Sequence, residues 1–497
     1  MGLARSGPAR LSLATLRDVP ARMRPGYDPG AVGVGIVHLG LGAFARAHAA
    51  VYTDDVLAAH GGDWGLCGVS QRSRTVSDQL RPQDGLYSVL ERSPEGTAAR
   101  VIGSVREVLL AGDAPDLLAA RIADPRTRIV SLTVTEKGYR HDPATGRLRR
   151  ADPELAADAE GRAPRTVLGQ LAAGLDARRA VGAPITVLCC DNVPRNGWLL
   201  RRLLTEFAER RDARTGGHLA GWVDSEVTFP STMVDRIVPA SQPADRDEAA
   251  GLLGVTDAGT VVAEPFRQWV VEDSFAAGRP AWHDAGAILT DDVSAYEVLK
   301  LRLLNGAHSA LAYLGALAGH EFIWQAVADP ALNAVVRRLM AEDAAPTAAS
   351  PDGVAADRYR ELVLERFANP ALGHRTAQVA MDGSQKLPQR LLDTARERLA
   401  AGAEPVWVCL AVAAWMRYVV SQGPDLDDPM AAQLAAAVGG ADEPEAVVRA
   451  LLGVEDVFGT DLAASAVFRD RVTDWLAQLH TRGAADTVRA AAGAGSP

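Results

Sequence analysis

Short apolar runs of strand length recur through residues 1–287, separated by helical or polar stretches. The runs are apolar nearly throughout instead of alternating, which is what strands buried on both faces of a parallel sheet require. Helical stretches between successive runs are typical of a doubly wound sheet. The pattern therefore predicts an α/β domain of the Rossmann type over residues 1–287. Its predicted strands cover residues 33–42, 64–70, 100–105, 127–136 and 183–192.

From residue 288 the β-branched runs disappear, and long segments with a helical periodicity of alanine, leucine and arginine follow. Apolar residues that recur every three or four positions indicate amphipathic helices. The pattern predicts an all-helical domain over residues 288–497, with a loop at 341–353 and a frayed tail from residue 484. The predicted helices cover residues 292–318, 331–342, 354–367, 386–401, 405–421, 428–438, 444–453 and 462–480.

Residues 1–30 form an arginine-rich N-terminal segment. The segment lacks the continuous apolar core of a secretion signal, and Asp18 with several prolines disfavours an import helix. We expect a structured or loosely attached N-terminal extension rather than a targeting peptide.

Composition narrows the range of partners. The net charge of −10 and the pI near 5.6 argue against a nucleic-acid ligand, which normally meets a basic surface. The sequence has no uninterrupted run of about 18 apolar residues, so we expect no membrane-spanning segment. The ten histidines show no HxH or HExxH spacing, so no metal site is indicated. We expect a monomer or small homo-oligomer that binds a small-molecule substrate.

The cysteines indicate the compartment. All four lie in apolar surroundings and none belongs to a CxxC pair, so neither a disulfide framework nor a zinc site is indicated. This use of cysteine is typical of a protein in the reducing cytoplasm. The four are Cys67, Cys189, Cys190 and Cys409.

A Gly-x-Gly turn ends the first predicted strand, at Gly40 and Gly42. A strand that feeds such a turn and then a helix lets backbone N–H groups meet a pyrophosphate. Phe44 and Ala45 occupy the region of the third glycine of the usual fingerprint, so a plain tight turn is the alternative. The place of the turn on the first strand of a βα series favours a dinucleotide site.

The loop after the second strand bears on the choice between NAD and NADP. An acid at this point would hold the ribose diol of NAD. Here Arg72 and Arg74 precede the first acid, Asp78. The arginines leave room for a 2′-phosphate, so NADP stays open beside NAD.

One largely apolar helix, residues 295–319, carries four polar residues: Glu297, Lys300, Asn305 and His308. In an α-helix they fall within an arc of about 140°. They form either a hydrated edge or one side of a ligand site. Because the neighbouring leucines and alanines indicate burial, we expect desolvation to lower the lysine pKa, which suits a general acid/base.

Several motifs together resemble the polyol-specific long-chain dehydrogenase/reductases, a family that includes mannitol 2-dehydrogenase and fructuronate reductase. The resemblance spans nearly the whole chain in the family's order. It implies a Rossmann-type domain followed by a helical domain, and a metal-independent oxidoreductase. The matching stretches are residues 38–55, 131–139, 190–197, 233–239, 264–275, 296–315 and 374–390.

The resemblance implies roles for the polar residues of the helix. Lys300 resembles the catalytic acid/base, and Asn305 with Asn192 resembles the pair of amides that hold the developing oxyanion. His308 is similar to a substrate-orienting residue. Glu297 resembles a carboxylate that relays protons between the lysine and solvent, with a structural ion pair to Lys300 as the alternative.

The resemblance also implies binding residues in the first domain. Val234 and Asp235 match positions that line the polyol site, although a strand-end ion pair between Asp235 and Arg236 is the alternative. The cofactor contacts that it implies are Gly40, Gly42, Ala43, Phe44, Arg72 and Glu136.

Three residues near position 380 bear on the substrate. Mannitol dehydrogenases carry an arginine eight residues before the lysine of the DGS-x-K motif, where this chain has Gln378. This resembles the fructuronate reductase branch, whose substrate carries a carboxylate. Arg375 or Lys386 would pair with that carboxylate, and surface solvation is the alternative for each.

The predicted function is therefore reversible, NAD(H)-dependent reduction of D-fructuronate to D-mannonate. The first alternative is a polyol 2-dehydrogenase that interconverts mannitol or arabinitol with a ketose. A non-catalytic Rossmann protein that senses a nucleotide or sugar is the second alternative. A sensor predicts a broken set of lysine, asparagine and histidine, and here the set is intact.

Overall fold

The computed structural model describes residues 8–142, 145–351 and 353–493. The chain divides into two compact units, Met1–Val293 and Ser294–Pro497, and we describe each by itself.

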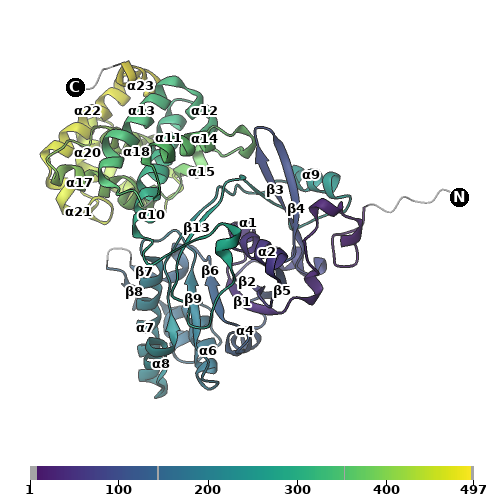
Figure 1. Cartoon of the computed structure of the whole chain (residues 1–497). Helices are drawn as coiled ribbons and strands as arrows, with labels where there is room; N and C mark the ends of the chain where they lie inside the picture. Colours follow the sequence, from purple (N-terminus) through teal and green to yellow (C-terminus); the bar gives the residue numbers. More distant parts are fainter. Residues whose placement is uncertain (1–7, 143–144, 352, 494–497) are drawn as a thin grey trace. The chain divides into compact units, whose positions relative to one another are not determined.

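The first unit is built on a six-stranded, wholly parallel sheet in the order β10-β9-β6-β1-β2-β5 (Figure 1). The first three strands in chain order, β1, β2 and β5, lie side by side from the middle of the sheet to one edge. The next three, β6, β9 and β10, lie side by side from the middle to the other edge. This order is that of a Rossmann fold, with the topological switch point between β1 and β6, and it confirms the predicted doubly wound domain. The strands are β1 (Val34–Leu39), β2 (Gly65–Ser70), β5 (Val105–Leu110), β6 (Ile129–Leu132), β9 (Ile185–Cys189) and β10 (Val227–Thr228).

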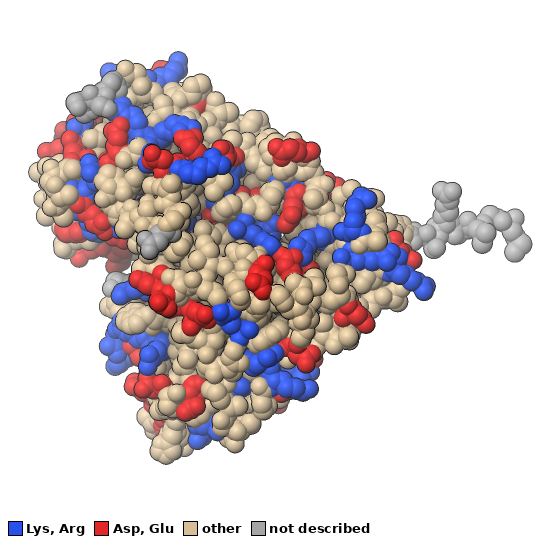
Figure 2. Space-filling model, in the orientation of Figure 1, with Lys and Arg blue, Asp and Glu red and all other residues tan. Residues whose placement is uncertain are grey.

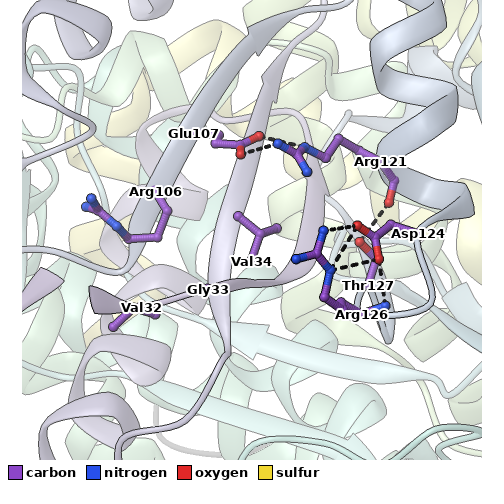
Figure 3. A pocket seen from close by; sticks show the side chains of 9 residues that line it. All are labelled: Val32, Gly33, Val34, Arg106, Glu107, Arg121, Asp124, Arg126 and Thr127. Carbon is purple, nitrogen blue, oxygen red and sulfur yellow. Dashed lines mark hydrogen bonds and ion pairs between the residues drawn. The ribbon is translucent and has the colours of Figure 1, made fainter. Parts of the chain in front are cut away.

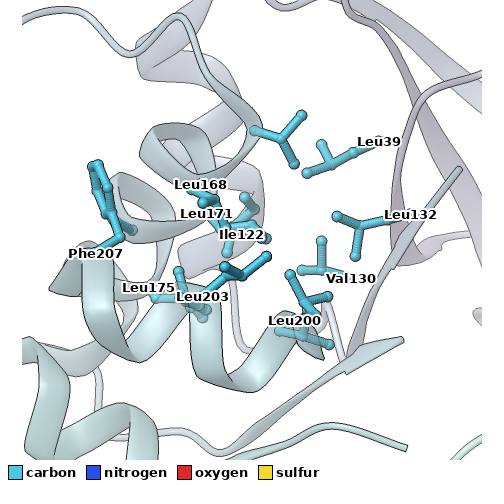
Figure 4. Packing of buried hydrophobic residues seen from close by; sticks show 14 of the residues in the cluster. Leu39, Ile122, Val130, Leu132, Leu168, Leu171, Leu175, Leu200, Leu203 and Phe207 are labelled. Atoms are coloured by element: carbon cyan, nitrogen blue, oxygen red, sulfur yellow. The ribbon is translucent and has the colours of Figure 1, made fainter. Parts of the chain in front are cut away.

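Helices cover both faces of the sheet, and their apolar sides form two cores. In β1, Val37 and Leu39 belong to one core while Ile36 belongs to the other. Adjacent residues of a strand face opposite sides, so both sides of β1 are buried, as its unbroken apolar run predicts. Figure 4 shows the first core, in which the strands meet apolar side chains of three helices. These helices are α4 (Pro115–Ala123), α6 (Val167–Arg179) and α7 (Asn196–Thr215).

The predicted strand at 100–105 is wrong in its bounds. The structure has β4 ending at Ile102 and the sheet strand β5 beginning at Val105. Gly103 and Ser104 separate the two strands, and an added Cβ on Gly103 would lie 2.6 Å from the Cγ of Pro29. The apolar run therefore spans the junction between two strands of different sheets. The sequence did not predict β10, because a strand of two residues is too short to show a hydrophobic pattern.

Smaller sheets and helices complete the first unit. Two three-stranded sheets have the orders β11-β13-β14 and β12-β3-β4, and β7 pairs with β8. Their strands are β3 (Tyr87–Ser93), β4 (Gly96–Ile102), β7 (His141–Asp142), β8 (Arg147–Leu148), β11 (Thr232–Asp235), β12 (Val261–Ala263), β13 (Gln268–Glu272) and β14 (Ile288–Thr290). The remaining helices are α1 (Ala43–Ala47), α2 (Ala49–His60), α3 (Arg74–Leu80), α5 (Pro153–Ala159), α8 (Leu219–Glu226) and α9 (Pro243–Leu253), with 3₁₀ turns η4 (Arg81–Gln83), η5 (Glu136–Tyr139) and η6 (Trp282–Ala285).

The N-terminal segment is structured from residue 8 onward. Leu11 and Val19 are fully buried in a core that includes Leu253, and the segment forms a β-bridge between Arg10 and Thr256. Three 3₁₀ turns shape it: η1 (Leu16–Asp18), η2 (Ala21–Met23) and η3 (Pro29–Ala31).

The second unit is all-helical over its described residues, which confirms the predicted class. Its helices are α10 (Ser294–Leu299), α11 (Gly306–Leu317), α12 (Ile323–Ala328), α13 (Pro330–Arg338), α14 (Ala356–Phe367), α15 (Thr376–Ala380), α16 (Gly383–Leu387), α17 (Asp393–Ala400), α18 (Val406–Gln422), α19 (Ala431–Val438), α20 (Pro444–Leu452), α21 (Glu455–Ala464), α22 (Ala466–Arg482) and α23 (Ala484–Gly493). Three segments are π-helical: η7 (Lys300–Asn305), η8 (Leu339–Ala344) and η11 (Pro388–Leu392). Short 3₁₀ turns are η9 (Ala345–Thr347), η10 (Pro370–Leu372) and η12 (Gly423–Asp425).

Two predictions in this unit need correction. The expected frayed tail from residue 484 is helix α23, in which Thr487 and Val488 are buried against α11 and α13. The expected loop at 341–353 begins later, because η8 and η9 continue to Thr347.

Helix α18 is the central helix of the second unit. The stretch Val406–Asp425 is long and apolar enough to cross a membrane by length and composition, a candidate that the search for an uninterrupted apolar run missed. Within the unit, 67% of its apolar window is buried, and it packs on α11 and α22. Such burial is what the core helix of a globular unit shows.

Charged side chains of both signs are interspersed over the face in Figure 2. All four cysteines are buried and unpaired. Among the described residues no group of three histidine, cysteine or acidic side chains is placed to hold a metal ion.

Candidate active site

The glycine turn lies at the switch point of the sheet. Gly40 has φ +98°, and an added Cβ would lie 2.1 Å from the carbonyl oxygen of Thr133 at the end of β6. Both observations require glycine, since a side chain would be strained and would collide with backbone. The turn therefore brings the ends of β1 and β6 together where a doubly wound fold binds its nucleotide.

The segment after the turn leaves space for a ligand. Gly42 precedes α1, and an added Cβ there would meet only the Gly40 carbonyl oxygen, at 3.9 Å. The expected single helix is two, because His48 has φ −124° and ψ −90° between α1 and α2. Ala43 and Phe44 open α1, and the Phe44 ring stacks on His48 at 5.0 Å. A glycine turn with an open outer face fits the pyrophosphate of a dinucleotide.

The residues expected near the ribose of the cofactor follow β2 and β6. Arg72 is exposed in the loop after β2, and Arg74 forms a surface ion pair with Asp113 at 2.7 Å. Glu136 begins η5, and its side chain lies outside the described residues.

Val234 and Asp235 are both buried, on the edge strand β11. Arg236 forms an ion pair with Glu91 at 2.6 Å and donates to the Glu264 carbonyl oxygen at 2.9 Å. Arg236 thus has partners other than Asp235, and the strand-end ion pair stays an alternative account of Asp235.

Asn192 is exposed in the loop that follows β9. The carboxyl ends of parallel strands form the ligand-binding edge of this fold. The side chain of Asn192 thus lies on the same edge of the sheet as the Gly40 turn.

In the second unit, the helix that carries Lys300 and Asn305 is not a continuous α-helix. Between α10 and α11 it widens into the π-helical segment η7, where the Gly306 N–H donates to the Leu301 carbonyl oxygen five residues earlier. Residues five apart then lie on successive turns. Lys300 and Asn305 therefore lie closer to one face than they would in an α-helix, and the arc expected for an α-helix is too wide.

A second π-helical segment packs on the first. An added Cβ on Gly306 would lie 2.9 Å from the carbonyl oxygen of Arg390 in η11. Pro388 opens η11 inside an otherwise continuous helix and cannot donate to the helical ladder, which accounts for the local widening. The close approach at Gly306 fixes where the Lys300 segment lies within this unit.

The polar residues of this helix are buried. Lys300 is 5% exposed, Asn305 7% and His308 9%, while Glu297 is partly exposed. Arg302 points elsewhere and pairs with Glu397 of α17 at 2.7 Å. Burial excludes a hydrated edge as the account of this helix.

Two of these buried groups lack a partner. Asn305 Oδ1 and His308 Nε2 form no hydrogen bond to any residue that the structure describes. An unsatisfied buried polar atom costs about 1–3 kcal/mol. The two atoms lie on successive turns of one helix, where hydroxyl groups of a ligand would supply the missing partners.

His308 is held as a neutral imidazole. Its ring stacks on Phe367 at 4.5 Å and meets His374 edge-on at 5.0 Å. Burial moves the pKa of His308 well below its ordinary value, and the nearby His374, Arg390, Lys386 and Arg366 add to the effect. Burial, together with Lys386, lowers the pKa of His374 to about 4. Both rings are therefore neutral near pH 7.

Three cations lie near enough to His308 to lower its pKa: Lys386, Arg390 and Arg366. Lys386 Nζ donates to the carbonyl oxygens of Val379, at 3.3 Å, and Met381. The sequence analysis found Lys386 but missed the arginines, because helical arginines are usually solvated.

Arg375 and Gln378 lie at the surface of α15. The Arg375 side chain is 54% exposed and pairs with Glu321 at 2.8 Å. Its guanidinium also lies over the Phe322 ring, and Gln378 is exposed. These contacts favour the surface alternative for Arg375.

A cavity of about 360 Å³ lies at the opposite edge of the Rossmann sheet, beside Val34 (Figure 3). Its charges are largely paired, Arg121 with Glu107 and Arg126 with Asp124. The cavity is separate from the glycine turn, which lies at the other end of β1.

Comparison with known families accounts for both units. The mannitol dehydrogenase Rossmann domain matches residues 34–284, and the mannitol dehydrogenase C-terminal domain matches residues 292–480. The chain belongs to the mannitol dehydrogenase family. It is accordingly an oxidoreductase that acts on CH–OH groups, as the resemblance implied.

Relatives within the mannitol dehydrogenase family differ in substrate. D-mannonate oxidoreductase of Escherichia coli is 44% identical over 481 residues, covering 94% of this chain and 97% of the relative. Mannitol 2-dehydrogenase of Pyrenophora tritici-repentis is 39% identical over 488 residues, covering 95% and 84%.

The fold also matches a solved member of the mannitol dehydrogenase family. Pseudomonas fluorescens mannitol 2-dehydrogenase, in a ternary complex with NAD and D-mannitol, superposes with a TM-score of 0.88. It is 37% identical, and the match covers 97% of this chain and 99% of that one.

Proposed function

We propose that this chain catalyses the reversible, NAD(H)-dependent reduction of D-fructuronate to D-mannonate. The observation that carries the proposal is the positive charge near the neutral His308, whose pKa is lowered by Lys386, Arg390 and Arg366. A carboxylate is the part of a sugar acid that such cations recognise, and an uncharged polyol gains little from them. The likeness to the E. coli D-mannonate oxidoreductase supports the same substrate.

NAD is the proposed cofactor, and when bound it supplies the hydride to the ketone carbon. The close-packed Gly40, with its positive φ, and the open face at Gly42 suit its pyrophosphate. A related enzyme is known in complex with NAD. We therefore favour NAD over NADP, with Arg72 exposed in the loop after β2.

Lys300 donates a proton to the oxygen that becomes the alcohol and accepts it in the reverse direction. Its burial on a mostly apolar helix suits a general acid/base near neutral pH. Glu297, one turn before it and partly exposed, relays that proton to solvent.

Asn305 and Asn192 donate to the developing oxyanion, a role suited to donors that the fold holds in place. His308 orients the substrate through Nε2, which has no partner among the described residues. Lys386 binds the carboxylate in preference to Arg375, which Glu321 engages at the surface. Val234 and Asp235 line the sugar site, and Asp235 accepts from a hydroxyl group.

The second candidate is a mannitol 2-dehydrogenase. The likeness to the P. fluorescens enzyme, across nearly the full length of both chains, favours it. The four buried, unpaired cysteines agree with a reducing compartment such as the cytoplasm for either activity.

Turnover assays separate the candidates. The purified chain is mixed with NADH and either D-fructuronate or D-fructose, and the loss of nicotinamide absorbance is followed. Rapid turnover of fructuronate with little of fructose supports the proposal. The reverse preference would replace it with the polyol activity, and no turnover with either ketone or with NADPH would reject both.

A further inference from the structure

A carboxylate after β9 fastens the loop that follows β6. Asp191 accepts hydrogen bonds from the backbone N–H groups of Val134, at 3.0 Å, and Thr135, at 2.9 Å. It also accepts one from the Tyr139 hydroxyl, at 2.6 Å. β6 and β9 are adjacent in the sheet. The bonds therefore join two neighbouring loops on the ligand-binding edge.

The fastened loop is strained and touches the glycine turn. Thr135 has φ +67° and ψ 160°, a conformation that is otherwise almost confined to glycine. Such a residue persists only where its surroundings hold it, and strain of this kind clusters at functional sites. Thr133, two residues earlier, donates its hydroxyl proton to the Gly40 carbonyl oxygen at 2.8 Å. The position of this loop thus sets the position of the turn.

The other side of the same segment is tied to β11. Asn196 Nδ2 donates to the carbonyl oxygens of Asp191, at 3.0 Å, and Thr232, at 2.8 Å. The Thr232 N–H donates back to Asn196 Oδ1 at 2.9 Å. Thr232 begins the strand that carries Val234 and Asp235. Asn192 therefore lies between two anchored points, one toward the glycine turn and one toward β11.

The ionised carboxylate is needed for this arrangement. Burial raises the pKa of Asp191, whereas the Tyr139 hydroxyl and the two backbone amides lower it. A carboxylate accepts at both oxygens, but a carboxamide accepts at one and donates at the other. An asparagine at position 191 has nearly the same shape, yet in either orientation its NH₂ group faces a donor. The substitution Asp191→Asn thus breaks at least one of the three bonds and removes the charge, with little change in volume.

We propose that Asp191 is a positioning residue, which fixes the loop Thr133–Tyr139 against Gly40 for nucleotide binding and holds Asn192 in place. The part that concerns Asn192 rests on the proposed function, whereas the part that concerns the nucleotide does not.

The test compares Asp191→Asn with a matched variant of Asp158. That carboxylate also accepts from two backbone N–H groups, of Arg165 at 3.0 Å and Thr166 at 2.8 Å, and from the Thr166 hydroxyl at 2.6 Å. It fixes the start of α6 and contacts neither the Thr133–Tyr139 loop nor Asn192 through these bonds. Asp158→Asn therefore measures the general effect of losing a buried carboxylate in this unit.

NADH binding to the full chain is measured by nicotinamide fluorescence without substrate, together with the melting temperature. We expect Asp191→Asn to raise the Kd for NADH about tenfold or more, the equivalent of one lost charge-assisted hydrogen bond. We expect Asp158→Asn to lower the melting temperature comparably but to leave the Kd within about twofold. Equal Kd values for Asp191→Asn and the unmodified chain would overturn the proposal.

If Asp191→Asn does not fold, Tyr139→Phe decides the matter, because it removes one of the three bonds and retains the ring. A Kd raised about threefold supports the proposal, and an unchanged Kd rejects it. For the part that concerns Asn192, kcat is measured at saturating NADH with whichever ketone is turned over. A fall in kcat at an unchanged substrate KM supports that part, and an unchanged kcat contradicts it.

Discussion

Asn305 lies one π-helical turn beyond Lys300, because the Gly306 N–H donates to the carbonyl oxygen of Leu301, five residues back, instead of to an oxygen four residues back. The wider turn aligns two buried polar side chains that an α-helix would set apart. π-Helical turns inside α-helices are frequent at functional sites. The relationship gives a structural reason for grouping the two residues in one site.

Gly306→Ala tests this geometry. The new Cβ would lie 2.9 Å from the Arg390 carbonyl oxygen, so η7 and η11 must move apart. We expect the free energy of unfolding to fall by about 1–3 kcal/mol. We expect kcat to fall while NADH affinity, a property of the other unit, stays unchanged. The control is Gly221→Ala in α8, where nothing lies within 4 Å, and it should leave both stability and kcat intact.

Replacing Lys300 by alanine tests the acid/base. We expect kcat to fall by roughly 10²–10⁴-fold, the usual contribution of a general acid/base, with little change in the Kd for NADH. Stopped-flow single turnovers separate the chemical step from product release. Activity retained within a few-fold would show that another group transfers the proton.

Lys386→Gln and Arg375→Gln form a matched pair for carboxylate recognition. We expect Lys386→Gln to raise the KM for fructuronate by about tenfold or more, because a charge-assisted contact is lost. Arg375 pairs with Glu321 at the exposed surface, so its replacement should cost less than about 1 kcal/mol and leave KM nearly unchanged. A larger rise in KM for Arg375→Gln than for Lys386→Gln would assign carboxylate binding to Arg375. Melting temperatures show whether Lys386→Gln also lowers stability, because the substitution removes the hydrogen bonds of Lys386 to Val379 and Met381.

The buried histidines predict acid lability. The folded-state pKa of His374 is about 4 and that of His308 is well below its ordinary value, whereas both titrate near 6.5 when unfolded. The unfolded chain therefore binds more protons below pH 6.5, and stability is lost as the pH falls from there toward 4. Each histidine contributes up to roughly 1.4 kcal/mol per pH unit in this window.

Urea unfolding at pH 7 and pH 5 measures this loss. His374→Asn should reduce the difference between the two pH values, and the surface variant His218→Asn should not. An unchanged pH dependence in His374→Asn would mean that the buried ring takes up a proton without cost.

The sequence predicted what depends on local pattern. The β1 run, Gly40 and the apolar helix around Lys300 each carry their signal within a few residues, and the structure has all three. The structure differs where distant residues decide. The π-helical turn ends at Gly306, which meets Arg390 of a distant segment, and Arg375 pairs with Glu321 of another. The hydrophobic periodicity of the sequence reveals neither of these contacts.

Roles within the site came from a different source. Helix geometry showed only that Lys300, Asn305 and His308 lie on one side, and the family resemblance supplied their functions. Arg366 and Arg390 went unnoticed because a helical arginine carries no sequence sign of burial. Their effect on the pKa of His308 required coordinates.

The measurement that most directly tests the central claim is a competition between the two alcohols. Equal concentrations of D-mannonate and D-mannitol are oxidised together by this chain with NAD, and the consumption of each is followed by NMR. We predict that mannonate is consumed first and that Lys386→Gln weakens this preference. Faster consumption of mannitol, with a preference that Lys386→Gln leaves unchanged, would contradict the assignment of a sugar acid as substrate.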